Sequence, residues 1–409
     1  MFENKDEIEK VILFAVDIGD GENVEQNLDE LEELASTAGA ITVGRMIQNK
    51  ESIDNASYLG SGKVNELAEM IFQTGATGVI CDDELSPIQM KNLEEVLNVK
   101  IMDRTMVILD IFASRAITKE GKIQVELAQL KYRSSRLIGM GNIMSRLGGG
   151  IGTRGPGEKK LEIDRRIIKN RIAQLSRELK DVVSHRDVMR KQRMISNLPI
   201  VAIVGYTNAG KSTLLNHLTN AGVLEEDKLF ATLDPTSRNL KLINGQEIIL
   251  TDTVGFIRKL PHHLINAFRS TLEEAKYADI ILHVVDASNP QADLHIAAVY
   301  ETLQGLEVKD KPVITLFNKV DRLEELPVIK DFHADVTLNI SAKNEQGFEE
   351  LMDKLAEIIN KSKVYIEKTI PYQEAGLIQK IRKFGNLIEE EYREDGIFIR
   401  AYVDKSLSV

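Results

Sequence analysis

One stretch constrains the possible folds of this chain more than any other. An apolar segment at residues 199–204 runs directly into the octapeptide GYTNAGKS at residues 205–212. The spacing GxxxxGK[ST] between a strand and a helix is the signature of a phosphate-binding P-loop. Its glycines let successive backbone N–H groups face phosphate oxygens, and the following helix adds its positive N-terminal end. Lys211 can then reach the β- and γ-phosphates, and the Ser212 hydroxyl can ligate Mg²⁺. The sequence therefore predicts an α/β domain that binds a nucleotide with Mg²⁺.

A second apolar segment, residues 247–252, ends in an acid that can serve the same metal. Asp252 can hold Mg²⁺ through water. The tripeptide TVG follows, and the backbone N–H of Gly255 can sense the γ-phosphate.

Two further motifs decide which base is bound. A strand-like segment at residues 313–317 leads into NKVD at residues 318–321. The carboxylate of Asp321 can accept both N1–H and the exocyclic amine of guanine, whereas adenine offers no matching pair of donors. The tripeptide SAK at residues 341–343 follows another strand, where a backbone N–H can meet the guanine O6. The sequence therefore predicts a guanine-nucleotide site that binds GTP and GDP.

Composition excludes several other classes of protein. Of the 409 residues, 43% are hydrophobic and 28% are charged, as in ordinary globular proteins. No apolar run is long enough to span a membrane, and the acidic start MFENKDEIEK has no apolar core of a signal peptide. The single cysteine, Cys81, cannot form an internal disulfide. We therefore expect a soluble protein of the cytoplasm that does not span a membrane.

Hydrophobic periodicity divides the chain into four segments. Residues 1–120 alternate short strands with amphipathic helices, which predicts an α/β domain with a parallel sheet. The expected strands are residues 11–16, 41–43, 78–81 and 99–102, and the expected helices are residues 24–37, 64–73 and 87–97. Residues 121–197 read as a long antiparallel helical hairpin, residues 198–363 as a Ras-like P-loop G domain, and residues 364–409 as a small α+β domain. The element GSGK at residues 60–63 lacks the P-loop spacing, so we interpret it as a tight turn before a helix.

The hairpin is also the basic part of an acidic chain. The net charge of the whole chain is −11, but residues 131–193 hold 17 Lys/Arg and only 6 Asp/Glu. Its second helix has an apolar stripe with coiled-coil steps of three and four residues, from Leu161 to Met189. The tip, residues 141–157, holds seven glycines together with Arg146 and Arg154. A basic segment on an acidic body can dock on phosphate through one face.

Taken together, these motifs resemble those of the HflX family of translation-factor-related GTPases. GYTNAGKS, FATLDPT at residues 230–236, DTVGF at 252–256, NKVD and SAK resemble its GTP-binding set. YLGSGK at residues 58–63 and GTRGPGEKKLEIDRR at residues 152–166 resemble segments outside the G domain. The similarity reaches residue 363, and no family motif is evident in the tail. The resemblance implies a GTP hydrolase that binds the large ribosomal subunit and, in several members, splits stalled ribosomes.

The resemblance also implies roles for individual residues. The first switch would be residues 230–234, with Thr232 as the second Mg²⁺ ligand beside Ser212; the residues themselves leave Thr236 open as an alternative. Lys211, Thr232 and Gly255 would act on the γ-phosphate during hydrolysis. Asn208 stands where related GTPases with GxxNxGKS can hold an activating K⁺, the alternative being a side chain that hydrogen-bonds its own loop.

The complete set of residues predicted to contact nucleotide spans five loops. It comprises Gly205, Tyr206, Thr207, Asn208, Ala209, Gly210, Lys211, Ser212, Phe230, Ala231, Thr232, Leu233, Asp234, Asp252, Thr253, Val254, Gly255, Asn318, Lys319, Val320, Asp321, Ser341, Ala342 and Lys343.

We expect a monomer whose hairpin tip, residues 141–166, contacts ribosomal RNA. Two other functions remain open: a GTP-dependent RNA-processing or RNA-modifying factor, and a non-catalytic GTP switch that gates a protein partner. Against the first, residues 1–120 show no metal-ligand cluster and no paired His/Cys arrangement. We interpret the seven histidines of the chain as surface or loop residues.

Overall fold

The computed structural model describes residues 8–147, 156–194, 198–219, 229–230, 235–259, 274–325, 329–361 and 363–403. Most of the predicted first switch, Ala231, Thr232, Leu233 and Asp234, lies outside these residues, as do residues 148–155 of the hairpin tip. The chain separates into two compact units. The first comprises Met1–Val182 with two short pieces, Lys228–Phe230 and Lys259–Phe268, and the second comprises the remainder.

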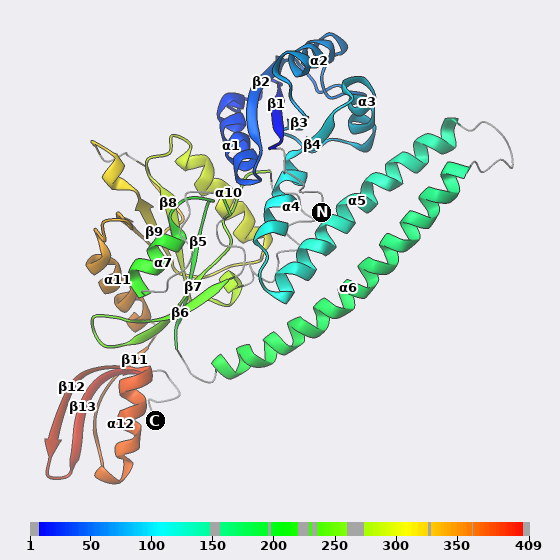
Figure 1. The fold of residues 1–409 in the computed structure, drawn as a ribbon. Helices are drawn as coiled ribbons and strands as arrows, with labels where there is room; N and C mark the ends of the chain where they lie inside the picture. Colours follow the sequence, from blue (N-terminus) through cyan, green and yellow to red (C-terminus); the bar gives the residue numbers. More distant parts are fainter. Residues whose placement is uncertain are drawn as a thin grey trace, which may run out of the picture. The chain divides into compact units, whose positions relative to one another are not determined.

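The N-terminal part of the first unit is the predicted α/β domain (Figure 1). Its four strands form a parallel sheet in the order β2-β1-β3-β4. The elements in chain order are β1 (Lys10–Asp17), α1 (Val24–Thr37), β2 (Ile41–Asn49), α2 (Ser61–Thr74), β3 (Gly78–Cys81), α3 (Pro87–Leu97), β4 (Lys100–Asp103) and α4 (Arg104–Arg115). Periodicity placed α1, β3 and α3 correctly because each has a clean apolar pattern between turn residues.

Three details of this domain differ from the sequence pattern or add to it. Strand β2 extends well beyond the short apolar stretch that predicted it, because parallel pairing with β1 continues through its polar residues. Helix α4 was not predicted, since its apolar run continues that of β4. Asp103 caps α4 by accepting a hydrogen bond from the Met106 N–H at 3.0 Å. The element GSGK forms the N-cap and first turn of α2, beginning at Gly60.

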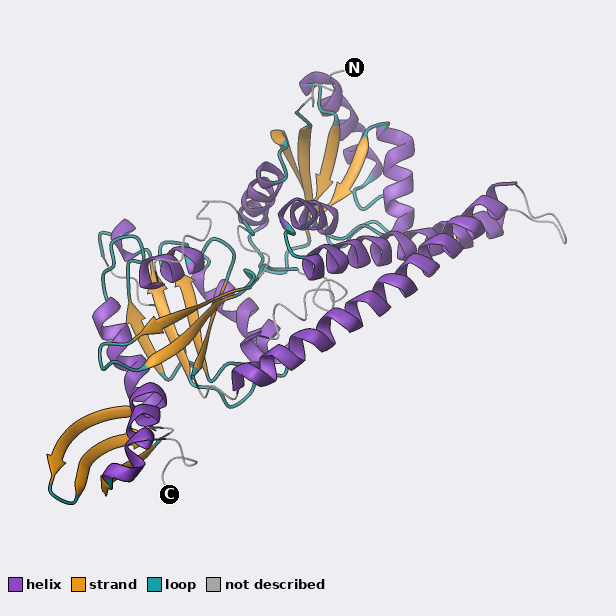
Figure 2. Ribbon diagram, turned by 60° about the horizontal axis from the view of Figure 1, so that its bottom comes forward, coloured by secondary structure: helices purple, strands orange, loops and turns teal. Residues whose placement is uncertain are grey.

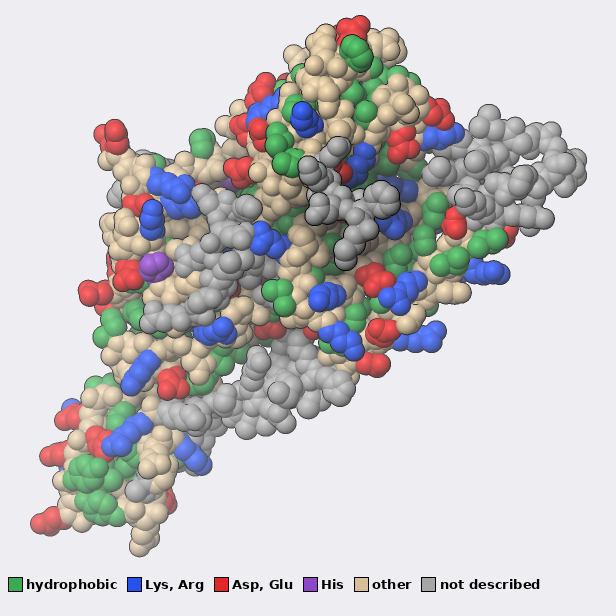
Figure 3. Space-filling view, viewed as in Figure 1, with side chains coloured by type: hydrophobic (Ala, Val, Ile, Leu, Met, Phe, Trp, Pro, Cys, Tyr) green, Lys and Arg blue, Asp and Glu red, His purple; other side chains and the backbone are tan. Residues whose placement is uncertain are grey.

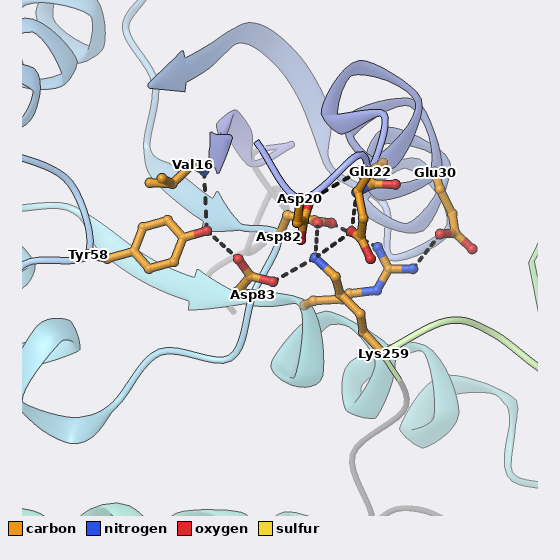
Figure 4. A network of polar contacts seen from close by, with 10 residues as sticks. Val16, Asp20, Glu22, Glu30, Tyr58, Asp82, Asp83 and Lys259 are labelled. Carbon is orange, nitrogen blue, oxygen red and sulfur yellow. Dashed lines mark hydrogen bonds and ion pairs between the residues drawn. The ribbon is translucent and has the colours of Figure 1, made fainter. Parts of the chain in front are cut away.

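A network of buried and partly buried charges lies just beyond β3 (Figure 4). Asp82, whose side chain is 2% exposed, forms ion pairs with Arg104 at 2.9 Å and with Lys259 at 3.0 Å. Lys259 also pairs with Asp83 at 2.6 Å, and Asp83 accepts a hydrogen bond from the Tyr58 hydroxyl at 2.5 Å. Burial lowers the pKa of Lys259, but the two aspartates outweigh it, so that its pKa lies above the usual value. Each of these charged side chains thus has an oppositely charged partner within the first unit.

The two long helices of the predicted hairpin are α5 (Lys119–Leu147) and α6 (Pro156–Met194), which run side by side (Figures 1 and 2). Within the first unit they bury Ile123 and Leu127 of α5 against Leu175 of α6, with Leu179 and Val182 packed beside them. This seam uses part of the predicted apolar stripe. A salt bridge from Arg171 to Glu126 at 2.7 Å flanks it.

The second unit contains a six-stranded sheet in the order β10-β9-β8-β5-β7-β6. All its neighbouring strands are parallel except the edge pair β6–β7. The elements are β5 (Ile200–Gly205), α7 (Lys211–Thr219), β6 (Thr236–Lys241), β7 (Glu247–Asp252), β8 (Ile280–Asp286), α10 (Ala292–Gly305), β9 (Val313–Asn318), the 3₁₀ turn η1 (Val320–Arg322), β10 (Val336–Asn339) and α11 (Phe348–Lys361). Because these strands are parallel, the loops after β5, β7 and β9 gather at one edge of the sheet.

The C-terminal part of this unit is the predicted small α+β module. Its antiparallel sheet has the order β11-β13-β12. The elements are β11 (Val364–Ile370), η2 (Tyr372–Glu374), α12 (Ala375–Phe384), β12 (Asn386–Arg393) and β13 (Gly396–Val403). It has a buried cluster of its own, in which Ile378 and Ile381 of α12 contact Ile399 and Val403 of β13. The α/β fold class, with an N-terminal domain, a hairpin, a G domain and a small tail, is thus confirmed.

We predict that Leu175→Ala loosens the hairpin. Leu175 is 1% exposed between the two helices, and truncating a buried leucine costs about 2–5 kcal/mol. Amide hydrogen exchange of α5 and α6 in the full-length protein should therefore accelerate strongly. Ile167→Ala on the same helix is the matched control, because Ile167 is 59% exposed and should leave exchange nearly unchanged. Equal exchange in the two variants would contradict the observed seam.

Candidate functional site

The P-loop connects β5 to α7 and closes around two glycines. A Cβ on Gly205 would lie 2.2 Å from the Val284 carbonyl oxygen, and a Cβ on Gly210 would lie 2.2 Å from Nδ2 of Asn318. Gly210 also has a φ of +97°, which other residues rarely adopt. Both glycines are therefore required by close approach of neighbouring strands as well as by the curl of the loop.

Lys211 is buried at the first position of α7 and held by the loop itself. Its Nζ donates hydrogen bonds to the carbonyl oxygens of Gly205 at 3.1 Å and Tyr206 at 2.6 Å. Burial lowers its pKa to about 8, with Asp252 acting in the opposite direction and Lys319 adding to the decrease. A buried amine with so low a pKa gains most from an approaching phosphate, which restores its favourable electrostatic surroundings.

The residues present fit Mg²⁺. The Ser212 hydroxyl donates to Oδ2 of Asp252 at 2.9 Å, so that a hydroxyl and a carboxylate oxygen meet between α7 and the end of β7. Mg²⁺ prefers such oxygen ligands together with water and phosphate. Of the two threonines open as the second ligand, Thr232 lies outside the described residues, and Thr236 is paired with Asp252 across β6 and β7.

The base-binding loops are joined by one side chain. Asn318, buried at the end of β9, accepts a hydrogen bond from the Ala342 N–H through Oδ1 at 2.8 Å. Its Nδ2 donates to the Ala209 carbonyl at 2.8 Å. The P-loop, NKVD and SAK are thereby brought together, as a guanine site requires. Asp321 accepts from the Ser341 hydroxyl at 2.5 Å, which orients its carboxylate in the exposed η1 turn.

Lys319 of NKVD and Lys343 of SAK have different surroundings. Lys319 has a φ of +65°, and its Nζ forms an ion pair with Asp286 at the end of β8, at 2.8 Å. Lys319 is the N-cap residue of η1. Lys343 is exposed after the buried Ala342.

The DTVGF segment lies directly against the P-loop. The Thr253 hydroxyl donates to the Ile203 carbonyl at 2.7 Å. The Phe256 N–H donates to the Gly205 carbonyl at 3.0 Å, and the Phe256 carbonyl accepts from the Thr207 N–H at 2.8 Å. The predicted γ-phosphate sensor, Gly255, is held between these contacts. Of the first switch only Phe230 is described here, and its ring packs edge-on against Phe112 of the first unit.

Two histidines of this unit contradict the interpretation of all seven as surface or loop residues. His295 of α10 is buried and stacks on the ring of Tyr206 in the P-loop, with centroids 3.7 Å apart. His283 is fully buried on β8, 3.5 Å from Asp331, and burial lowers its pKa. Sequence reasoning missed both because a histidine on an apolar strand or helix has no local signal that distinguishes it from an exposed one.

One cavity of this unit lies away from the nucleotide motifs. It has a volume of about 1060 Å³ and is lined by Ile281, near the start of β8, and by Val313, at the start of β9. The NKVD motif lies at the opposite, carboxyl end of β9. Within the described residues, no three His, Cys, Asp or Glu side chains come together as a metal site, and no helix is long and apolar enough to cross a membrane.

The fold and this set of loops define a P-loop GTPase that recognises guanine nucleotides. Three family models match successive parts of the chain: "GTP-binding GTPase N-terminal" at residues 25–113, "GTP-binding GTPase Middle Region" at 115–193 and "50S ribosome-binding GTPase" at 200–319. GTPase HflX of Lacrimispora saccharolytica is 61% identical over 407 residues, covering 100% of this chain and 96% of that protein. The chain therefore belongs to the HflX family of GTPases, and it hydrolyses GTP.

Two other proteins are also similar to this chain. GTPase HflX of Escherichia coli is 39% identical over 399 residues, covering 97% of this chain and 93% of that protein. A crystal structure of a GTP-binding protein from Sulfolobus solfataricus in complex with GDP is 24% identical, with a TM-score of 0.45, and covers 87% of this chain and 99% of that one.

We predict that Asp321→Asn weakens GTP and GDP binding by about 1–3 kcal/mol, because an amide nitrogen would face the N1–H donor of guanine. Isothermal titration against GTP, GDP and ATP would measure this. Asp310→Asn, at an exposed turn of the same unit, is the control and should bind guanine nucleotides normally. Equal affinity of the native protein for ATP and GTP would rule out Asp321 as the base reader.

A second prediction concerns the proton on Lys211. With a pKa of about 8 in the free site, part of this amine is neutral above that pH. Bound phosphate favours the charged form, so the complex holds more protons than the free protein. Nucleotide affinity should therefore fall as pH rises above about 8, with proton uptake on binding. Titrating GDP in buffers of different ionisation enthalpy would show it, and no uptake above that pH would contradict the lowered pKa.

Proposed function

We propose that this GTPase binds the large ribosomal subunit and couples GTP binding and hydrolysis to the dissociation or rescue of ribosomes. The observation that carries the proposal is the combination of a guanine-nucleotide G domain with a long, basic helical hairpin in one chain. The family description "50S ribosome-binding GTPase" for residues 200–319 supports the same partner. The site of action would be the cytoplasm, with the protein acting as a monomer.

The hairpin supplies the surface for ribosomal RNA in this proposal. Basic and acidic side chains are mixed along its described part (Figure 3). On α6 the structure describes side chains from residue 162 onward, and these include Arg165 and Arg166. Arg146, Arg154, Lys159 and Lys160, which carry the remaining charge of the tip, have side chains outside the described part. A concentration of positive charge in the tip would be neutralised by RNA phosphates, with release of counterions.

The residues at the nucleotide would have the roles that are usual in P-loop GTPases. Ser212 and Thr232 would hold Mg²⁺ directly and Asp252 through water, Lys211 and the Gly255 N–H would contact the γ-phosphate, and Mg²⁺ would neutralise charge on the phosphates. No glutamine follows DxxG, because Phe256 takes that position, so hydrolysis by the free protein should be slow. The ribosomal subunit would then accelerate it by ordering residues 230–234 and 255–260.

Two measurements test this function. GTP hydrolysis is followed with and without large ribosomal subunits, and co-sedimentation with separated subunits is followed with GDP and with a non-hydrolysable GTP analogue. Stimulated hydrolysis together with GTP-dependent binding to the large subunit is expected. Binding without stimulation would favour the non-catalytic switch. Stimulation by free RNA substrates but not by subunits would favour an RNA-processing factor.

We predict that reversing the charge of Arg154, Lys159 and Lys160 to glutamate lowers affinity for the large subunit at least tenfold and flattens its dependence on salt, because phosphate contacts are lost. The control carries similar charge reversals at Arg177 and Lys180, two exposed positions further along α6. It should retain most of the affinity. Unchanged affinity in the tip variant would show that the tip is not the RNA contact.

We also predict that replacing Na⁺ with K⁺ raises basal hydrolysis severalfold through Asn208. Its side chain is half-buried and makes no hydrogen bond within the described part of the chain, so the alternative role in bonding its own loop is not observed. A cation there would supply positive charge beside the phosphates. Asn208→Gly should abolish the K⁺ effect without straining the backbone, whose φ is +59°. An equal K⁺ effect in this variant would exclude Asn208.

A further inference from the structure

Phe256 replaces the glutamine that would orient the attacking water in a Ras-type site. Ras-type sites use a glutamine directly after DxxG for this purpose. Here Phe256 stands at that position, is 1% exposed, and offers only its backbone groups, both of which are bonded to the P-loop. Another hydrogen-bonding group beside the γ-phosphate would be needed to place the water.

Thr207 of the P-loop carries such a group. Its side chain is 6% exposed, and its Oγ1 has no hydrogen-bond partner among the described residues. Its backbone is fixed, because its N–H donates to the Phe256 carbonyl at 2.8 Å. An unpaired buried hydroxyl is unfavourable in a folded protein and calls for an explanation. A ligand that enters the loop would provide the missing partner.

The surroundings of Thr207 indicate which part of the ligand its hydroxyl would contact. A Cβ built on Gly255 would lie 2.8 Å from Cγ2 of Thr207 and 3.1 Å from Nζ of Lys211. The threonine side chain thus lies beside both groups expected at the γ-phosphate: the Gly255 backbone and the Lys211 amine. Contact between the threonine methyl and Gly255 restricts χ1 of the branched side chain, and this also sets the direction of the hydroxyl.

We propose that the Thr207 hydroxyl is a catalytic residue that hydrogen-bonds the reacting end of bound GTP, either a γ-phosphoryl oxygen or the water that attacks it. The water oxygen forms a bond to the γ-phosphorus while the bond from that phosphorus to the β,γ-bridging oxygen breaks. The proton of the water passes to phosphate, and the products are GDP and inorganic phosphate. Thr207 orients the reactants and is not itself changed. The proposal concerns basal GTP hydrolysis and is independent of ribosome binding.

Three variants separate this role from simple packing. Thr207→Val keeps the branched shape and the methyl contact with Gly255 but removes the hydroxyl. Thr207→Ser keeps the hydroxyl but loses the methyl. Thr302→Val removes a threonine hydroxyl from α10, outside the nucleotide loops, and serves as the control for this type of substitution.

The experiment is single-turnover GTP hydrolysis, with GDP affinity and the melting temperature of the nucleotide-free protein measured on the same samples. For Thr207→Val we expect hydrolysis to fall at least tenfold, GDP affinity to stay within about twofold, and the melting temperature to stay equal or rise, because an unpaired buried hydroxyl is removed. Thr207→Ser should hydrolyse GTP within a few-fold of the native rate.

Affinity for a non-hydrolysable GTP analogue identifies the atom contacted. A decrease in Thr207→Val points to a γ-phosphoryl oxygen, and an unchanged value points to the attacking water; both agree with the proposal. Native turnover in Thr207→Val would overturn it. An equal loss of GDP affinity and melting temperature in that variant would also overturn it, since the hydroxyl would then be structural.

Discussion

The nucleotide site depends on one buried amide. Asn318 bonds the P-loop through the Ala209 carbonyl and the SAK loop through the Ala342 N–H, both at 2.8 Å. Its own position comes from β9, which pairs with β8 and β10 on either side. Three loops from distant parts of the chain are therefore held in one arrangement by two hydrogen bonds from a rigid strand end. The closeness that this requires leaves no space for a side chain at Gly210.

The buried amine of Lys211 supplies positive charge for the phosphates of a bound nucleotide. Lys211 is buried, and burial lowers its pKa to about 8. The carbonyls of Gly205 and Tyr206 orient the amine without neutralising it. A phosphate brings the missing negative charge into surroundings where water cannot screen the attraction. The Thr207 hydroxyl is also buried and has no hydrogen-bond partner among the described residues, while the Thr207 N–H bonds the Phe256 carbonyl.

The first unit holds a network of buried and partly buried charges. Asp82 sits at the carboxyl end of β3, where two cations share it. Arg104 also reaches Glu30 at 2.6 Å, so each charge in the network has at least one opposite partner. Asp82, Arg104 and Lys259 each have at least two oppositely charged partners, so removal of one of the three leaves each of the other two with at least one partner. The hairpin, by contrast, is held by an apolar seam.

The sequence by itself determined the order of the elements and the chemistry of the nucleotide loops. Helices α1 and α3 and strands β3 and β7 follow from local periodicity, and GYTNAGKS, DTVGF, NKVD and SAK are contiguous motifs that can be read without a structure. Only the tertiary structure decided which of these groups touch: the Asn318 bridge, the approach of Gly255 to Thr207 and Lys211, and the burial of His283 and His295. It also decided that Lys259 pairs with Asp82, a residue 177 positions away. A local pattern indicates which face of a helix or strand is buried, but not which residues it will contact. Those contacts depend on the register and packing of elements that are far apart in the chain.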